Sequence, residues 1–387
     1  MGGGDVRRHT DRQGRKMGGI IVRKFALILI AMVLAPSVMA QTADWQKVWD
    51  STLAAAKKEG KVVIIGSPDP VMRKEVIPAF QARYDGIKIE YIATASSGQA
   101  VSRVRLERAA GIYSIDVYLS GPDTSYNVLY PEKLIDPIKP LMILPEVTDV
   151  ANWKRGALWY MDPEEQYVLR LYNTLQSSIF YNGDKIKAEE MRTAQDLLNP
   201  KWRGKIVTDS PTSPTGTGGN QAASIYSQLG PDFVKKLYVD QKPVINSDRR
   251  QFTDWLARGT QFICLTCRVD DIAPMQKDGF NIVQVYELEG LQSRLVSSPF
   301  LVSLANKAPN PNAARVFINW LATKEGIEIY SRGYGSASLR ADADESFLDP
   351  KLVPRPGVSY PDDASPAWRS VEKVEIGEKI KVLLSGQ

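Results

Sequence analysis

The feature that most constrains the fold is a regular alternation of short apolar runs with amphipathic stretches. In the first third of the chain, runs typical of buried strands lie at 61–66, 87–93 and 115–119. The stretches between them, 70–84 and 99–110, have the spacing of amphipathic helices. This alternation favours an α/β fold, in which helices connect the strands of a sheet. We therefore expect a β-α-β-α-β unit here.

Each strand of this predicted unit runs into a small or polar loop. Ligands of open α/β sheets bind at the carboxyl ends of strands, beside helix N-termini. Three serine-bearing loops at one edge suit a small polar or anionic ligand, although serines in such places also serve as caps and turns. The candidate ligand residues from these loops are Ser67, Ser96, Ser97 and Ser120.

The second half of the chain repeats the pattern, with strands expected at 179–182, 205–208, 261–265 and 281–286. After the second of these, the segment DSPTSPTGTGGN opens a helix, whose backbone N–H groups and positive dipole end favour an anion. A capped surface loop is the alternative. The segment matches neither a P-loop nor a dinucleotide fingerprint. Its candidate ligand residues are Thr215, Thr217 and Gly218.

The N-terminus has the pattern of a cleaved signal peptide. Arg23 and Lys24 precede an apolar run at 25–35, and small residues follow as far as Ala40. The run is shorter than the roughly 20 apolar residues that span a bilayer, although a membrane anchor is the alternative reading. We expect residues 1–40 to be removed and the protein to be periplasmic. Met17 would make a more ordinary start than Met1.

Removal of residues 1–40 would change the net charge of the protein, and with it the classes of partner that the charge favours. Residues 1–40 hold seven of the 49 Lys and Arg and two of the 44 Asp and Glu, so 42 of each sign remain. The balance gives no support for nucleic-acid binding. The only histidine, His9, also leaves, which argues against Ser-His-Asp and Cys-His catalysis. We expect no enzyme activity, no metal and no cofactor.

Both cysteines lie in one motif, Cys264-Leu265-Thr266-Cys267. A disulfide fits an oxidising compartment. Redox-active C-x-x-C pairs begin a helix, whereas this pair ends an apolar run, so we interpret it as structural or incidental. Whether the two thiols are bonded stays open at this point.

Four stretches carry a family resemblance: GKVVIIGSPDP, IPAFQARYDGIKIEY, DLLNPKWRGKIVTDSP and KAPNPNAARVFINWLATKEGIE. With them the chain resembles the periplasmic solute-binding proteins of ABC importers that carry ferric iron, thiamine, polyamines, phosphorylated sugars or phosphonates. The resemblance implies an α/β, two-lobed periplasmic-binding-protein fold (type II) with a ligand cleft between the lobes. Such proteins close by hinge motion and deliver ligand to permease subunits in the inner membrane.

The resemblance also implies a domain organisation. After the signal peptide, we expect lobe 1 at 41–148 plus 288–340 and lobe 2 at 149–287. A C-terminal tail, 341–387, would pack on one of them. Within these parts the sequence predicts a strand at 298–305, a helix at 312–326 and a last helix at about 370–384. A monomer is expected.

The ligand class follows from a departure from the family pattern. Iron-binding members have two adjacent tyrosines after the strand that corresponds to 261–265, where this chain has Thr266-Cys267-Arg268. Fe(III) prefers anionic oxygen ligands, which Cys267 and Arg268 do not provide. Arginine suits an anion, so Arg268 and the Arg249–Arg250 pair are candidates, although arginines are often only solvated. Tyr286, Tyr181, Trp159 or Tyr160 would stack on an organic group, although such aromatic residues more often belong to the core.

We therefore predict the capture of a small anionic organic solute, a carboxylate or a phosphorylated compound. The alternatives are a ferric ion held with a synergistic anion, a sensory protein that presents its ligand to a receptor, and a secreted enzyme.

Overall fold

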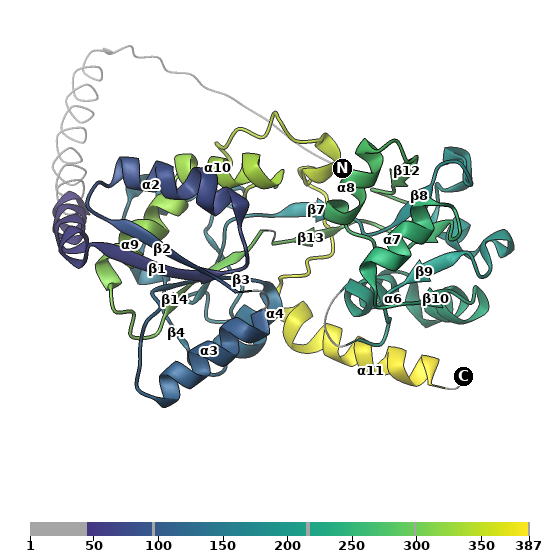
Figure 1. The fold of residues 1–387 in the computed structure, drawn as a ribbon, viewed down its shortest axis with the longest axis horizontal. Coiled ribbons are helices and arrows are strands. Elements are labelled where there is room, and N and C mark those ends of the chain that lie inside the picture. Colours follow the sequence, from purple (N-terminus) through teal and green to yellow (C-terminus); the bar gives the residue numbers. More distant parts are fainter. Residues whose placement is uncertain (1–44, 95–96, 214–216, 298, 386–387) are drawn as a thin grey trace, which may run out of the picture. The chain divides into compact units, whose positions relative to one another are not determined.

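The computed structural model describes residues 45–94, 97–213, 217–297 and 299–385. The predicted signal peptide, Ser96 and Thr215 therefore lie outside the described residues. The chain divides into two compact units, 1–50 and 51–387. In the first, the described residues 45–50 are helical. The helices and strands of the second unit are labelled in Figure 1.

The predicted β-α-β-α-β unit is confirmed. Strand β1 (Lys61–Gly66) pairs in parallel with β2 (Lys88–Ala93) on one side and β3 (Val117–Ser120) on the other. Helix α2 (Ile77–Arg83), preceded by a π-helical turn, connects β1 to β2, and α3 (Ser97–Ala109) connects β2 to β3 (Figure 1). The apolar side chains of β1 are buried, as its unbroken apolar run predicts.

This sheet recruits strands from much later in the chain. Strand β14 (Leu301–Ala305) lies antiparallel beside β3 and pairs on its other side with β6 (Val168–Arg170) and β4 (Ile135–Asp136), while β5 (Trp159–Tyr160) pairs with β6. The sequence predicts residues 159–170 in the second lobe, whereas β5 and β6 of this range pair in the first sheet. Where the lobe boundary falls stays a prediction.

The second sheet has five strands, β10 (Val244–Ile245), β9 (Ile206–Thr208), β11 (Ile263–Cys264), β8 (Phe180–Asn182) and β12 (Ile282–Gln284), in that order. All four apolar runs predicted in this region contribute a strand. Its helices include α6 (Thr217–Lys235), α7 (Arg249–Ala257) and α8 (Val269–Lys277).

The sequence patterns did not reveal a separate two-stranded sheet, formed by β7 (Thr174–Gln176) and β13 (Arg294–Val296). Three residues are too few to show a periodicity. Strand β7 follows β6 of the first sheet and precedes β8 of the second. Strand β13 follows β12 and precedes β14. The chain therefore passes between the two sheets at these two strands.

The expected helix 312–326 is two helices, α9 (Pro311–Leu321) and α10 (Lys324–Tyr334). The first ends at Leu321, and Thr323 caps the second, because its hydroxyl accepts a hydrogen bond from the backbone N–H of Gly326 at 3.2 Å. A Cβ on Gly326 would lie 2.2 Å from the carbonyl oxygen of Trp320, so the tight turn requires glycine there. The amphipathic pattern continues across this break and conceals it.

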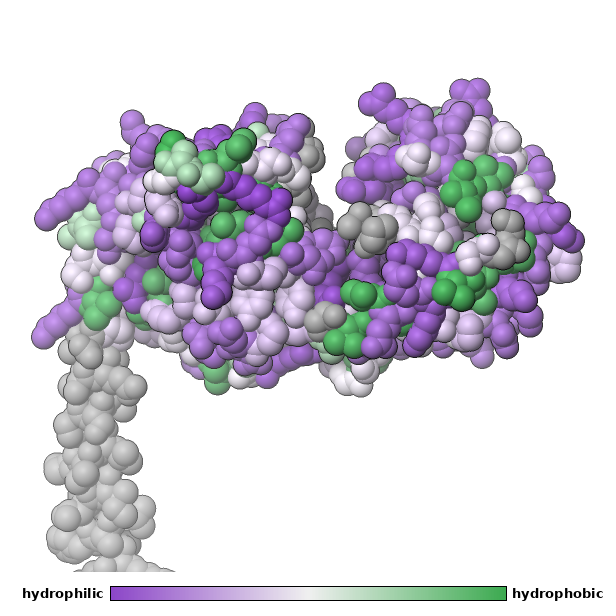
Figure 2. All heavy atoms as spheres, turned by 90° about the horizontal axis from the view of Figure 1, so that it is seen from below, coloured by the Kyte–Doolittle hydropathy of each residue, from purple (hydrophilic) through white to green (hydrophobic). Residues whose placement is uncertain are grey.

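The C-terminal region adds to the second core. Trp368 and Ile380 are buried in the same apolar cluster as Trp202, Phe233 and Leu237. Helix α11 (Lys373–Leu384), predicted at 370–384, carries Ile380 into that cluster. The face on which α11 lies is mostly hydrophilic, with small separate hydrophobic patches (Figure 2).

Candidate ligand site

Two of the predicted serine loops meet at one edge of the first sheet. The parallel register aligns Gly66 with Ala93, so β1 and β2 end together, beside the end of β3 at Ser120. A cavity of about 20 Å³ there is lined by Ser67 and Ser120, among others. It has room for about one water molecule, which is too little for an organic ligand. Ser97 begins α3, after the second of these strands.

The loop after β3 carries a second polar feature. Ser120 Oγ lies 2.8 Å from Ser125 Oγ, and between them the first turn of α4 (Pro122–Thr124) holds Asp123. Thr124 lines the small cavity together with Ser120. The loop therefore joins the serine edge directly to the carboxylate of Asp123.

Two cations from the C-terminal region approach Asp123. Arg369 Nη1 donates to Asp123 Oδ1 at 2.5 Å, and Lys373 Nζ lies 3.5 Å from the same oxygen. Their side chains are only 4% and 11% exposed. No motif in the sequence pointed to these residues, because their approach depends on where the tail packs.

Further buried charges surround this pair. Arg294 of β13 donates to Asp363 at 2.5 Å, and Arg369 Nε donates to the backbone carbonyl of Asp363. We call Asp123, Arg294, Asp363, Arg369 and Lys373 the Asp123 cluster. It holds three cations and two carboxylates. Burial lowers the pKa of Lys373, although the carboxylate of Asp123 opposes this shift.

The glycines at the start of α6 have a packing role. A Cβ on Gly218 would lie 2.3 Å from the carbonyl oxygen of Ser210, and one on Gly219 would lie 1.8 Å from that of Ser213. The loop at 209–213 thus rests directly on the first turn of the helix. Thr217 is half-buried at its first position. The role of these residues in ligand binding stays a prediction.

The two predicted arginines lie at the starts of two helices in the second half. Arg249 begins α7 and makes a bidentate ion pair with Asp271 of α8, at 2.7 and 2.9 Å. The carboxylate of Asp271 thus occupies Nε and Nη2 of Arg249. Arg268 precedes α8 and is exposed.

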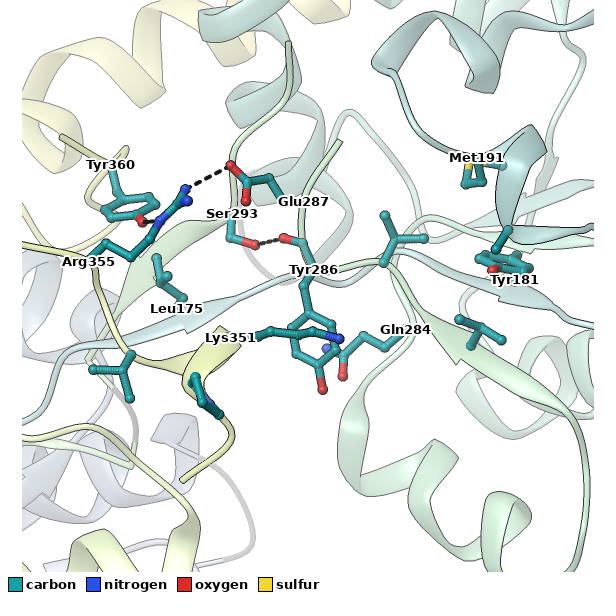
Figure 3. A pocket seen from close by; sticks show the side chains of 15 residues that line it. Leu175, Tyr181, Met191, Gln284, Tyr286, Glu287, Ser293, Lys351, Arg355 and Tyr360 are labelled. Carbon is teal, nitrogen blue, oxygen red and sulfur yellow. Dashed lines mark hydrogen bonds and ion pairs between the residues drawn. The ribbon is translucent and has the colours of Figure 1, made fainter. Parts of the chain in front are cut away.

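Tyr286 lies apart from the serine edge, in a cavity of about 430 Å³ (Figure 3). Its ring faces the Lys351 ammonium group, which lies 5.1 Å from the ring centroid. This cavity is lined by strands of the second half and by the 350–360 segment, and the predicted ligand residues other than Tyr286 do not line it. We call it the tyrosine pocket.

The two cysteines form a disulfide, with 5.7 Å between their Cα atoms. Cys264 is fully buried and Cys267 is 1% exposed, which suits a structural bond and not thiol exchange with other proteins. Across the described part of the chain, no group of three or more His, Cys, Asp or Glu side chains is arranged to hold a metal ion. None of the described helices is long and apolar enough to span a membrane.

The fold, two sheets connected by two crossing strands, is that of the two-lobed periplasmic binding proteins. It is shared by iron-bound HitA from Pseudomonas aeruginosa, with a TM-score of 0.59, 16% identity and coverage of 83% of this chain and 99% of that one. AfuA from Actinobacillus pleuropneumoniae, with fructose-6-phosphate bound, has a TM-score of 0.56, 18% identity and coverage of 85% and 99%. The substrate-binding protein of an ABC transporter from Agrobacterium tumefaciens has a TM-score of 0.60 and 15% identity. The match covers 84% of this chain and 94% of that one.

The sequence itself identifies the family. Residues 75–354, well over half of the chain, match the model of the family described as "Bacterial extracellular solute-binding protein". The chain therefore belongs to the bacterial extracellular solute-binding proteins, the ligand-capturing components of ABC importers. The resemblance seen in the sequence is confirmed. Family and neighbours are binding proteins and not enzymes.

Proposed function

We propose that this protein captures a small anionic organic solute, a carboxylate or a phosphorylated compound, and delivers it to the permease of an ABC importer. The observation that carries the proposal is the excess of one buried cation over the carboxylates in the Asp123 cluster, next to Ser120. Arg369 and Lys373 share the one carboxylate of Asp123, and a bound anion would offset the cost of burying the second positive charge.

The side chains of the cluster have complementary roles in this proposal. The guanidinium of Arg369 is a planar fork that suits a carboxylate or phosphate, and Lys373 adds a compact point charge. The hydroxyls of Ser67 and Ser120 are the neutral donors at the adjoining edge. Further ligand contacts remain predictions. They would come from helices of the second half, at Thr217, Arg249 and Arg268.

Among the structural neighbours, AfuA holds a sugar phosphate and HitA holds iron. The chemistry of this chain favours the first kind of ligand. Arg369 and Lys373 would repel a ferric ion, and the described residues offer no metal-binding group of carboxylates, cysteines or histidines. We propose further that the mature protein begins near Gln41 after removal of its leader, is periplasmic, works as a monomer and has no catalytic activity.

The test is a calorimetric screen of the ligand-stripped mature protein against carboxylates, phosphate esters, phosphonates, polyamines and ferric citrate. We expect one class of anion to bind. Lys373→Met should weaken that binding about 10- to 100-fold, which is the value of one charge-assisted hydrogen bond. Lys379→Met is the matched control, because Lys379 is exposed on the same helix. Binding of ferric citrate alone, or equal affinities of the two variants, would overturn the proposal.

A further inference from the structure

We infer that the tyrosine pocket is a second ligand site, which binds a small monocarboxylate with an apolar body. This goes beyond the proposed function, because the pocket and the Asp123 cluster have no residue in common.

The pocket has the size and walls of a small-molecule site. Its volume of about 430 Å³ lies within the usual range for such sites, roughly 300 to 1,000 Å³. Figure 3 shows Leu175, Tyr181 and Met191 around it, coming from β7, β8 and the segment that follows β8. Val283 and Val285 add further apolar surface. Methionine adapts its shape readily, which lets this wall fit ligands of differing outline.

The polar groups gather at one end. In Figure 3, the side chains of Lys351, Tyr286 and Gln284 point to the same place. Gln284 is held in position because its amide donates to the carbonyl of Ser177 at 3.0 Å. Burial, and next the carboxylate of Asp349, raise the pKa of Tyr286. A protonated tyrosine hydroxyl can donate to an anion.

The charges of the lining decide the class of ligand. Arg355 is already neutralised, because it donates to Glu287 at 3.0 Å and to the hydroxyl of Tyr360 at 3.0 Å. In the described part of the chain, the exposed Lys351 ammonium makes no ion pair, and it lies 5.1 Å from the centroid of the Tyr286 ring. One cation without a counter-charge selects one negative charge, and the apolar interior penalises a second.

The remaining side chains that line the tyrosine pocket indicate the shape of the apolar part of the ligand. Tyr181, Tyr286 and Tyr360 provide ring faces, and the aliphatic side chains fill the space between them. A flat or branched apolar group would be buried there while its carboxylate contacts Lys351. Because Lys351 and Tyr360 belong to the segment at 350–360, such a ligand would also fix that segment against β12.

The test uses benzoate as the probe and benzylamine, of similar shape and opposite charge, as the control ligand. On the mature protein, we expect benzoate to bind by calorimetry and benzylamine not to bind. Lys351→Met should weaken benzoate at least tenfold. Ala188→Trp, at an exposed position of the lining, should fill the pocket and abolish binding without disturbing the core.

Two further comparisons separate this inference from the proposed function. Lys351→Met should leave the affinity for the solute found in the anion screen within twofold, and Lys373→Met should leave benzoate binding unchanged. Failure of benzoate to bind at millimolar concentration, or binding that Lys351→Met does not affect, would overturn the second site. If Lys373→Met alone abolished benzoate binding, the second site would be wrong and the Asp123 cluster would be the site of that anion.

Discussion

Arg369 donates a hydrogen bond to Asp123 across 246 positions of sequence, with 2.5 Å between Nη1 and Oδ1. Asp123 lies in the loop that ends β3 of the first sheet. Arg369 follows Trp368, which is buried in the core of the second. The ion pair thus links the two halves of the fold at the serine edge, and an anionic ligand would compete with Asp123 for the same cation.

This competition predicts opposite effects of Asp123→Asn on binding and on stability. The affinity for the anionic solute should rise about tenfold, because the internal competitor is removed. The free energy of unfolding should fall by roughly 2 to 3 kcal/mol, because Arg369 and Lys373 are left buried without their partner. Calorimetry and urea denaturation measure the two quantities.

The matched control for that variant is Asp254→Asn. Asp254 pairs with Arg258 on the surface, where both side chains are largely exposed, so the unfolding free energy should change by less than about 1 kcal/mol. If Asp123→Asn changed the unfolding free energy as little as this control does, the charges of the Asp123 cluster would not depend on one another, and the proposed anion site would be wrong.

Acid should weaken the attachment of the segment after α10. Hydrogen bonds from Ser346 and Arg332 lower the pKa of Asp344 to about 2. Because the folded-state pKa lies below the unfolded value, its contribution to stability is complete above about pH 4 and is lost as the pH falls towards 2. The difference in unfolding free energy between the natural protein and Asp344→Asn should shrink over that interval. A difference that stayed constant over that interval would contradict this assignment.

Two glycine substitutions should change the unfolding free energy in opposite directions. Gly219→Ala places a methyl group against the carbonyl oxygen of Ser213, and we expect a loss of about 1 to 3 kcal/mol in unfolding free energy. Gly377→Ala, inside α11 with no neighbouring atom within 4 Å, should gain roughly 0.5 to 1 kcal/mol through helix propensity. Thermal unfolding of both variants tests the tight contact between the loop at 209–213 and α6. Equal changes in unfolding temperature would exclude that contact.

The disulfide should be a structural bond that ligand binding does not need. With both sulfurs buried, we expect Cys264 and Cys267 to resist mild reductants in the folded protein and to react with thiol reagents only after unfolding in reductant. The Cys264→Ser, Cys267→Ser double variant should lose about 2 kcal/mol by the loop-entropy relation. Its solute affinity should be unchanged. Ready reduction of the native protein would favour a redox role instead.

Much of the fold was predictable because the local periodicity of apolar residues indicates where strands and helices lie. The run at 61–66 is β1 residue for residue, and the four apolar runs of the second half each supply a strand of one sheet. The two crossing strands β7 and β13 were not predictable, since each is three residues long and takes its form from pairing with the other. The break at Thr323 was hidden by an amphipathic pattern that runs through it.

The candidate site was predictable only in part. Ser67 and Ser120 meet, because parallel strands in register end at one edge of a sheet. Tyr286 lies in a different cavity, and Arg249 is neutralised by Asp271. The type of a residue does not reveal its distant partner.

The sequence by itself determined the α/β class, the family and the positions of most strands along the chain, because hydrophobic periodicity and family motifs are properties of neighbouring residues. Only the tertiary structure decided which charges are buried together. Asp123, Arg294 and Arg369 come from three distant parts of the chain, and their approach depends on how the C-terminal segment packs into the second core. Burial then gives these charges their energetic weight, since the same side chains exposed to water would contribute little.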